Sequence, residues 1–319
     1  MMKLSQLLLF TPCACLFLNS VRADAVANAV PSLSLDLVGM IADYGREWRW
    51  HCDLNSKSVC GLDGFRVEFI AVNKDTICVS NQTTLWMFKH DGTCSQKLNG
   101  VKRPPGIAYD SRGVLFAAEN SDQMRSVIQT FKSDGTIARF TGTVDQFPHI
   151  PYDSCRFHRV SGICVHLDKN DKLVLYVCDN DCLTVVNPNG SLNRYVYFRD
   201  SVGRCTRPRS VAFGSGRVFV TVPDDDSVRV LDGKCNEISK WQATYGLYRL
   251  LHPTGIAYEA KTQTVFVCDT GNRRLVVFSG DGDYLHAITL SYAPLDVCAD
   301  GTRAPNKRRG ENVVSILAY

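Results

Sequence analysis

The stretch that decides the fold is HPTGIAYEAKTQTVFVCDTGNRRLVVFSGDGDYLHAITL, residues 252–290. It holds four short apolar segments, at 255–258, 264–268, 275–278 and 284–290, and turn-forming residues separate them. Apolar and polar residues alternate, β-branched and aromatic side chains are frequent, and no segment shows a long 3.6-residue period. The stretch therefore predicts four short antiparallel strands.

The same unit recurs along the chain. Copies begin at RPPGIAY (103–109), RVSGICV (159–165) and RPRSVAF (207–213), a weaker copy contains EFIAV (68–72), and a truncated one contains PLDVCADG (294–301). The equivalent apolar positions are Ile70, Ile107, Ile163, Val211, Ile256 and Val297, at spacings of 37, 56, 48, 45 and 41 residues. Periods of this length with four strands each predict a β-propeller, because each sheet must bury both faces against its neighbours.

The N-terminal segment is expected to complete the ring. The last copy, 294–319, has apolar material for only two or three strands, and Leu33–Gly45 looks like the outer strand of other copies. We therefore predict an all-β, six-bladed propeller over 64–319, closed by a strand from an N-terminal segment, 24–63. A disordered N-terminal arm is the alternative. Trp48 and Trp50 are expected outside a regular strand, as an exposed contact or as a cap on the closing blade.

At this point a family resemblance is visible. The unit Pro-x-Gly-Ile-Ala, followed by Val-x-Val-Cys with Asp269, Asn272 and Arg274, an apolar triplet and a glycine-rich turn, resembles the NHL repeat. Only the copy at 252–290 carries the full pattern, whereas the others lose the Asn and Arg. The resemblance covers roughly residues 64–319 and implies the fold, not the function, because this fold hosts many unrelated activities.

The N-terminus has the layout of a secretory signal peptide, residues 1–23. Lys3 precedes an apolar run from Leu7 to Leu18, and Val21 and Ala23 are small residues before a cut at Asp24. An uncleaved anchor is the alternative. We expect secretion or residence in the secretory-pathway lumen, without stable membrane insertion. The formal charge of +4 is not that of a nucleic-acid-binding protein.

Cysteines and glycosylation triplets agree with that compartment. Of 14 cysteines two lie in the predicted signal peptide, and the even remainder of 12 predicts that most of them pair. Cys52 with Cys60 and Cys178 with Cys182 are candidate local disulfides, and buried free thiols are the alternative. Asn81 and Asn189 begin N-glycosylation triplets in predicted turns.

One face of a propeller gathers the loops before the innermost strands and those between the second and third strands. We call this face the mouth. Alignment of the copies places one residue of each at the mouth: Glu68, Pro105, Ser161, Arg209, Thr254 and Leu295. This mixture predicts a binding site for a protein, peptide or glycan, and no nucleic-acid surface. A structural or adhesive matrix role is an alternative function.

Two enzyme classes compete with the binding function. The resemblance implies peptidyl-hydroxyglycine lyases, which hold zinc with histidines near the starts of inner strands, but none of the six mouth positions is histidine, and His158, His166 and His252 lie off the aligned positions. Lactonase-like propellers hold a divalent ion with carboxylates. The turn aspartates available for this are Asp179, Asp181, Asp224, Asp225, Asp226 and Asp269.

We expect those aspartates to bond to their own turns. Asp269 with Asn272 and Arg274 is expected to be a structural network. The sequence therefore predicts no catalytic residues, no metal and no cofactor, with calcium or another divalent ion as the open alternative.

Overall fold

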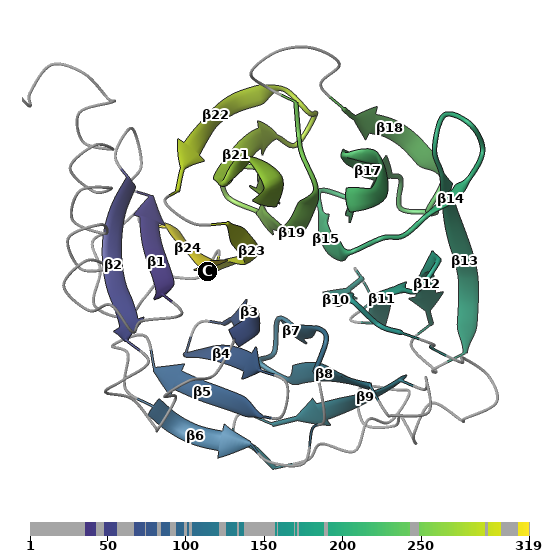
Figure 1. Ribbon diagram of the computed structural model, residues 1–319. Coiled ribbons are helices and arrows are strands. Elements are labelled where there is room, and N and C mark those ends of the chain that lie inside the picture. Colours follow the sequence, from purple (N-terminus) through teal and green to yellow (C-terminus); the bar gives the residue numbers. More distant parts are fainter. Residues whose placement is uncertain are drawn as a thin grey trace, which may run out of the picture.

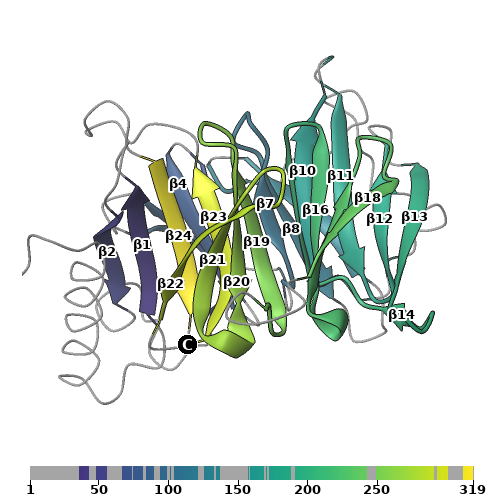
Figure 2. The same cartoon turned by 90° about the horizontal axis from the view of Figure 1, so that it is seen from above.

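The computed structural model describes residues 36–42, 48–55, 67–73, 75–81, 84–89, 94–98, 101, 104–120, 126–132, 134–136, 157, 159–168, 170, 172–187, 191–242, 249–290, 293–300 and 312–318. Their strands form antiparallel sheets set around a common axis, which is the arrangement of a β-propeller (Figure 1). Viewed from the side, the strands of neighbouring sheets stand side by side around the ring (Figure 2). The predicted fold class, an all-β propeller, is confirmed.

Five of the sheets consist of strands that are consecutive in the sequence. The first sheet is β3 (Val67–Val72), β4 (Thr76–Asn81), β5 (Leu85–Lys89) and β6 (Cys94–Leu98), and the second is β7 (Ile107–Tyr109), β8 (Leu115–Asn120) and β9 (Ser126–Phe131). The third sheet is β10 (Gly162–Leu167), β11 (Leu173–Asp179), β12 (Cys182–Val186), β13 (Leu192–Arg199) and β14 (Cys205–Thr206). The fourth is β15 (Ser210–Gly214), β16 (Arg217–Val222), β17 (Ser227–Leu231) and β18 (Glu237–Trp241), and the fifth is β19 (Pro253–Glu259), β20 (Thr264–Asp269), β21 (Arg274–Ser279) and β22 (Tyr284–Thr289).

The remaining sheet combines the two ends of the chain. Its order is β2-β1-β24-β23, with β1 at Asp36–Ala42, β2 at Trp48–Asn55, β23 at Pro294–Asp300 and β24 at Asn312–Ala318. β1 pairs antiparallel with β24 along its whole length.

The expectation that Trp48 and Trp50 lie outside a regular strand is wrong. Both belong to β2, where Trp48 pairs with Ala42 and Trp50 with Met40 of β1. β1 offers β2 a backbone edge to pair with, and this long-range pairing is not visible in the composition of REWRWHCD.

The innermost strand of each sheet lines the axis. These strands contact one another in the order β3, β7, β10, β15, β19 and β23, and β23 returns to β3 (Figure 1). β3 and β15 are therefore on opposite sides of the axis. Because consecutive strands are antiparallel, each inner strand begins on the face that also carries the turn between the second and third strands. This is the mouth.

The core lies between the sheets, and the second and third strands are buried on both faces. β17 and β12 are buried at every position, and β20 at every position after its first. Between the sheets of β15–β18 and β19–β22, Phe219 stacks on Tyr258 at 5.7 Å between ring centroids and packs against Trp241 at 5.5 Å. Because these strands are buried on both faces of their sheets, their sequences are continuous apolar runs and do not alternate between apolar and polar residues. Among the described residues, no helix has the length and apolar character that a membrane span requires.

The predicted disulfide between Cys178 and Cys182 is wrong, since both carry free thiols. The register pairs Cys178 with Leu183 and Cys182 with Asp179 across the hairpin of β11 and β12. Successive side chains alternate between the two faces of a sheet, so these two sulfur atoms point to opposite faces and cannot bond.

The wider expectation, that most of the 12 cysteines after the signal peptide pair, is also wrong. Besides Cys178 and Cys182, free thiols are carried by Cys78, Cys164, Cys205, Cys235 and Cys268. Most of these side chains are buried and act as small apolar residues of the core. Cys94 is disulfide-bonded. Cys52 lies in β2, its side chain is outside the described residues, and so is Cys60.

Candidate functional site

The structure brings the predicted mouth positions together at the starts of the inner strands. Pro105 is buried ahead of β7, Ser161 and Arg209 are half-buried ahead of β10 and β15, Thr254 is buried in β19, and Leu295 is half-buried in β23. Glu68 lies in β3, and its side chain is outside the described residues.

Two of these side chains tie neighbouring sheets together. Thr254 Oγ1 donates a hydrogen bond to the carbonyl oxygen of Leu295 at 2.6 Å. Ser161 Oγ donates one to the carbonyl oxygen of Pro208 at 3.0 Å. Both hydroxyls thus satisfy backbone groups of the next repeat, one in β23 and one just ahead of β15, and their contribution to the mouth is rigidity.

Arg209 crosses the mouth end of the channel. Its guanidinium carbon lies 5.3 Å from the ring centroid of Phe69, which belongs to β3 on the opposite side of the axis. A guanidinium at this distance from an aromatic ring makes a favourable cation–π contact. Arg209, just ahead of β15, and Phe69 in β3 therefore bridge the channel at its mouth end.

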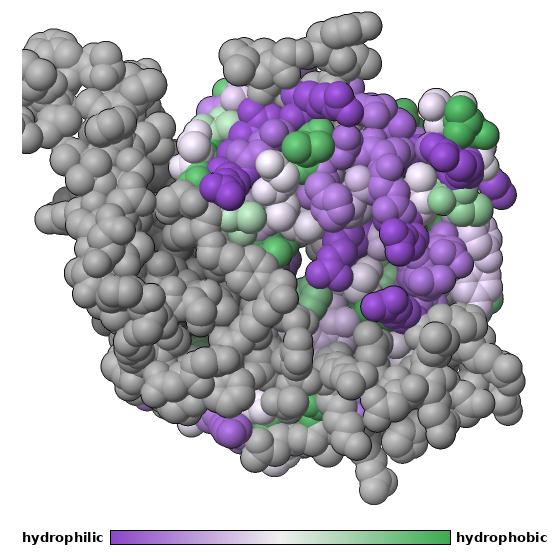
Figure 3. Space-filling view, in the orientation of Figure 1, coloured by the Kyte–Doolittle hydropathy of each residue, from purple (hydrophilic) through white to green (hydrophobic). Residues whose placement is uncertain are grey.

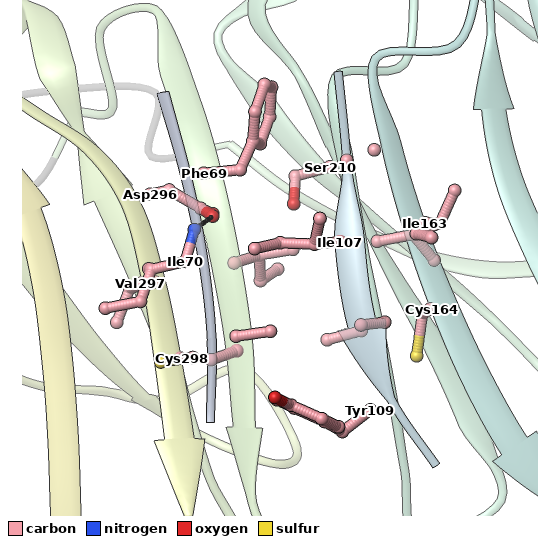
Figure 4. A pocket seen from close by; sticks show the side chains of 18 of the residues that line it. Phe69, Ile70, Ile107, Tyr109, Ile163, Cys164, Ser210, Asp296, Val297 and Cys298 are labelled. Carbon is pink, nitrogen blue, oxygen red and sulfur yellow. Dashed lines mark hydrogen bonds between the residues drawn. The ribbon is translucent and has the colours of Figure 1, made fainter. Parts of the chain in front are cut away.

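A buried carboxyl group stands beside this contact. Asp296 in β23 accepts a hydrogen bond from the backbone N–H of Ile70 in β3, with 3.0 Å between Oδ2 and N (Figure 4). Burial raises the pKa of Asp296 to about 7, although the N–H groups of Ile70 and Val297 and the charge of Arg209 act in the opposite direction. Asp296 is an ionisable residue at this level of the channel, and the repeat alignment does not single it out.

The turn aspartates of the mouth have structural partners. The bonds are Asp179 to the N–H of Arg159, Asp224 to Arg207, Asp225 to Arg229, Asp226 to Arg249, and Asp269 to Arg274. Asp269 also accepts the N–H of Leu251 and the amide of Asn272. The prediction that Asp269, Asn272 and Arg274 form a structural network is confirmed. The prediction that the turn aspartates bond to their own turns is wrong for Asp224 and Asp226, whose partners lie 17 and 23 residues away on other loops. In the part of the chain that the structure describes, no three His, Cys, Asp or Glu side chains form a group able to hold a metal ion.

The histidines lie apart. His252 is exposed at the mouth, whereas His166 lies near the other end of its inner strand and stacks on Phe213 at 3.7 Å between ring centroids. His158 is outside the described residues, as is the glycosylation candidate Asn189. The other candidate, Asn81, is the last residue of β4.

One exposed apolar side chain at the mouth was missed by the sequence analysis. Leu251 is 43% exposed, yet its backbone is held firmly. Its N–H donates to Asp269 Oδ1 at 2.7 Å, and its carbonyl oxygen accepts the N–H of Gly271 at 2.9 Å. Exposed Arg249, His252 and Arg273 flank it. Figure 3 shows that hydrophilic side chains predominate on the described part of this face. The sequence signal was the pair Leu250-Leu251 just before an inner strand.

Below the mouth, the inner strands enclose a channel cavity of about 250 Å³. Equivalent positions of the repeats form four successive layers, which run from the mouth to the opposite face. The first layer is Phe69, Gly106, Gly162, Ser210, Gly255 and Asp296; the second is Ile70, Ile107, Ile163, Val211, Ile256 and Val297; the third is Ala71, Ala108, Cys164, Ala212, Ala257 and Cys298; and the fourth is Val72, Tyr109, Val165, Phe213, Tyr258 and Ala299.

Glycine in the first layer is required by close backbone approach. A Cβ on Gly162 would lie 2.7 Å from the carbonyl oxygen of Arg209, and one on Gly255 would lie 2.5 Å from the Cα of Asp296. At the mouth end of the channel, the backbones of neighbouring inner strands are therefore in close contact.

Comparisons with known proteins support the fold. No protein-family model matches the chain, and no curated protein matches it. Among solved structures, the chain is similar to a catalytically inactive virginiamycin B lyase from Staphylococcus aureus with 9% identity and a TM-score of 0.57, over 90% of this chain and 96% of that one.

It is also similar to a gluconolactonase from Xanthomonas campestris with 14% identity and a TM-score of 0.56, over 80% and 86% of the two chains. A chain of a nidogen/laminin complex follows with 12% identity and a TM-score of 0.53, over 79% and 93%. At these identities the likeness shows the β-propeller fold alone.

Proposed function

We propose that this protein is a binding propeller whose mouth docks onto a protein, peptide or glycan partner. The observation that carries the proposal is Leu251, an exposed apolar side chain on a backbone held by Asp269 and Gly271. An apolar anchor that is already ordered loses little conformational entropy when a partner covers it. Interfaces commonly have an apolar core surrounded by a polar rim, and Leu251 with its polar neighbours fits that pattern.

The charges around Leu251 are also held in place. Arg249 bonds to Asp226 at 3.2 Å and Arg207 to Asp224 at 3.0 Å. Fixed ion pairs present a defined pattern of charge to a partner and favour selectivity more than affinity. Because these carboxylates already have partners, their arrangement favours a binding surface over a metal-dependent active site.

The fold itself leaves both classes open, since it is shared by a lyase, a gluconolactonase and a chain of a nidogen/laminin complex. The enzyme alternative makes a different prediction. A metal-dependent lyase or lactonase carries a stoichiometric ion, so elemental analysis of the purified protein separates the two functions.

We further propose that the binding takes place outside the cell or in the secretory-pathway lumen, after cleavage of residues 1–23, and that residues 24–63 complete a six-bladed ring. The pairing of β1 with β24 supports closure, and so does the hydrogen bond from Ile70 to Asp296, which joins the first and last inner strands. N-terminal sequencing of the mature protein tests the cleavage: a first residue at Asp24 supports it, and a first residue at Met1 contradicts it.

The docking face is tested with two leucine variants. Leu251→Glu places a charge at the mouth, and Leu285→Glu is the matched control because Leu285 is 49% exposed on the outer strand β22. Immobilised wild type and both variants are incubated with the extracellular fluid of the source tissue, and bound proteins and glycans are quantified by mass spectrometry. We expect one set of partners to be retained by wild type and L285E and reduced at least about tenfold by L251E. Equal retention by L251E would refute docking at the mouth.

A further inference from the structure

The charges on the mouth indicate the chemistry of its partner. We propose that the partner presents an acidic peptide segment, which places an apolar side chain against Leu251 and carboxylates against the arginines around it. This inference rests on the proposed function, because it names the class of partner for the same docking face.

Exposed positive side chains outnumber exposed negative ones on this face. In the loops ahead of the inner strands and the turns between second and third strands, as far as the structure describes them, two aspartates are exposed, Asp181 and Asp224. The arginines exposed there are Arg159, Arg204, Arg207, Arg249 and Arg273. The described part of the mouth therefore attracts negatively charged groups.

The ion pairs of the mouth hold the arginine outward and the aspartate inward. The side chain of Arg207 is 64% exposed and that of Asp224 is 32% exposed. The side chain of Arg249 is 63% exposed, against 19% for Asp226. A guanidinium has five N–H donors, so one bonded aspartate leaves donors available to a second carboxylate. An approaching partner thus meets guanidinium groups before it meets carboxylates.

Arg273 is well placed for a direct contact with such a partner. Its backbone lies in the left-handed region at φ 51° and is held on both sides. Its N–H donates to the carbonyl oxygen of Thr270 at 3.2 Å, and its carbonyl oxygen accepts the N–H of Leu290 at 2.8 Å. Its guanidinium makes no ion pair with any residue that the structure describes, so it can bind a carboxylate without displacing another group.

Leu251 lies within this group of charges and rests on a glycine. A Cβ at position 271 would lie 2.6 Å from Leu251 Cγ, so the leucine side chain packs directly on the Gly271 backbone. Arg249 is two residues before Leu251, and Arg273 is two residues after Gly271. An apolar contact surrounded by cations favours a peptide over a sulfated glycan, because the glycan supplies negative charge but no apolar side chain.

A displayed library of random peptides about twelve residues long tests the class of partner. Peptides are selected on immobilised wild-type protein after removal of those that bind the Leu251→Ser variant, in which serine adds no charge that would bias the selection. We expect the selected peptides to contain more Asp and Glu than the starting library, together with a large apolar residue. Selection of no peptide, or no excess of acidic residues, would overturn the inference. Peptides that depend on Leu251 but are not acidic would leave docking at the mouth intact.

Variants of single charges test the contact itself, with the most strongly selected peptide followed by fluorescence anisotropy. Arg273→Gln should weaken binding at least about threefold at low salt and less at high salt, because salt screens exposed charges. Arg273→Lys should keep most of the affinity. Lys234→Gln is the matched control, since it removes one exposed positive charge from the turn between β17 and β18 on the opposite face, and it should bind like the wild type.

Two results would contradict the contact. R273Q could bind the peptide like the wild type, or R273Q and K234Q could lose affinity equally, as they would through net charge alone. Heparin tests the glycan alternative in the same assay. If heparin binds more tightly than the peptide and binds the Leu251→Ser variant equally well, the partner is a sulfated glycan and the peptide assignment is wrong.

Discussion

Replacing the buried carboxyl of Asp296 should change how the stability of the protein depends on pH. Burial raises the pKa of Asp296 from 3.8 to about 7 in the folded protein, so the folded state binds this proton more tightly than the unfolded state does. Below pH 4 the group is protonated in both states, and its ionisation has no effect. As the pH rises from 4 to 7, ionisation increasingly disfavours folding, and above pH 7 the effect is constant.

The size of the effect follows from the shift. About three pKa units at 1.36 kcal/mol each give ~4 kcal/mol of stability lost by the wild type between pH 4 and pH 8 through this group alone. Asp296→Asn keeps an oxygen that can accept the Ile70 N–H but does not ionise. Relative to D296N, the wild type should therefore lose stability across this range.

The assay is urea unfolding of wild type and D296N, under reducing conditions, at several pH values from 4 to 8. The other ionisable groups near Asp296 do not change their charge between pH 4 and pH 8, so they do not contribute to the measured pH dependence of stability. Arg209 stays charged throughout, and burial holds the pKa of the Cys268 thiol well above its usual range. Asp281→Asn is the control, because Asp281 is exposed and pairs with Arg217 at the surface. A difference between wild type and D296N that stays flat with pH would refute the reasoning.

Three further outcomes follow from the packing and the ion pairs. Gly255→Ala should destabilise the protein by about 1–3 kcal/mol in urea unfolding, because its Cβ would meet the Cα of Asp296 at 2.5 Å, whereas Gly233→Ala, whose nearest contact would be 3.4 Å, should be nearly neutral. Arg274→Gln removes the charged partner of the fully buried Asp269 and should cost about 3–5 kcal/mol, against less than about 1 kcal/mol for Arg204→Gln in an exposed pair; equal losses would contradict the assignment. A thiol reagent should label the exposed Cys205 of the native protein before the buried Cys78, Cys178 and Cys268, which mass spectrometry of the labelled peptides can follow.

The sequence by itself determined the repeat and what each repeat needs locally. The six equivalent apolar positions, from Ile70 to Val297, are all buried in the inner strands, because a four-stranded sheet packed on both faces requires apolar residues there. The network of Asp269, Asn272 and Arg274 was also predictable, since its members lie within six residues of one another on one turn.

Only the tertiary structure decided which distant residues meet. The repeat alignment placed Arg209 at the mouth, but its contact with Phe69 depends on β3 and β15 lying opposite each other across the axis. The free thiols of Cys178 and Cys182 depend on the register of one hairpin, which close spacing in the sequence does not reveal. Residue patterns report which side chains must be buried, whereas distances across the ring depend on how the sheets pack and twist around the axis. Those distances exist only once the whole ring has assembled.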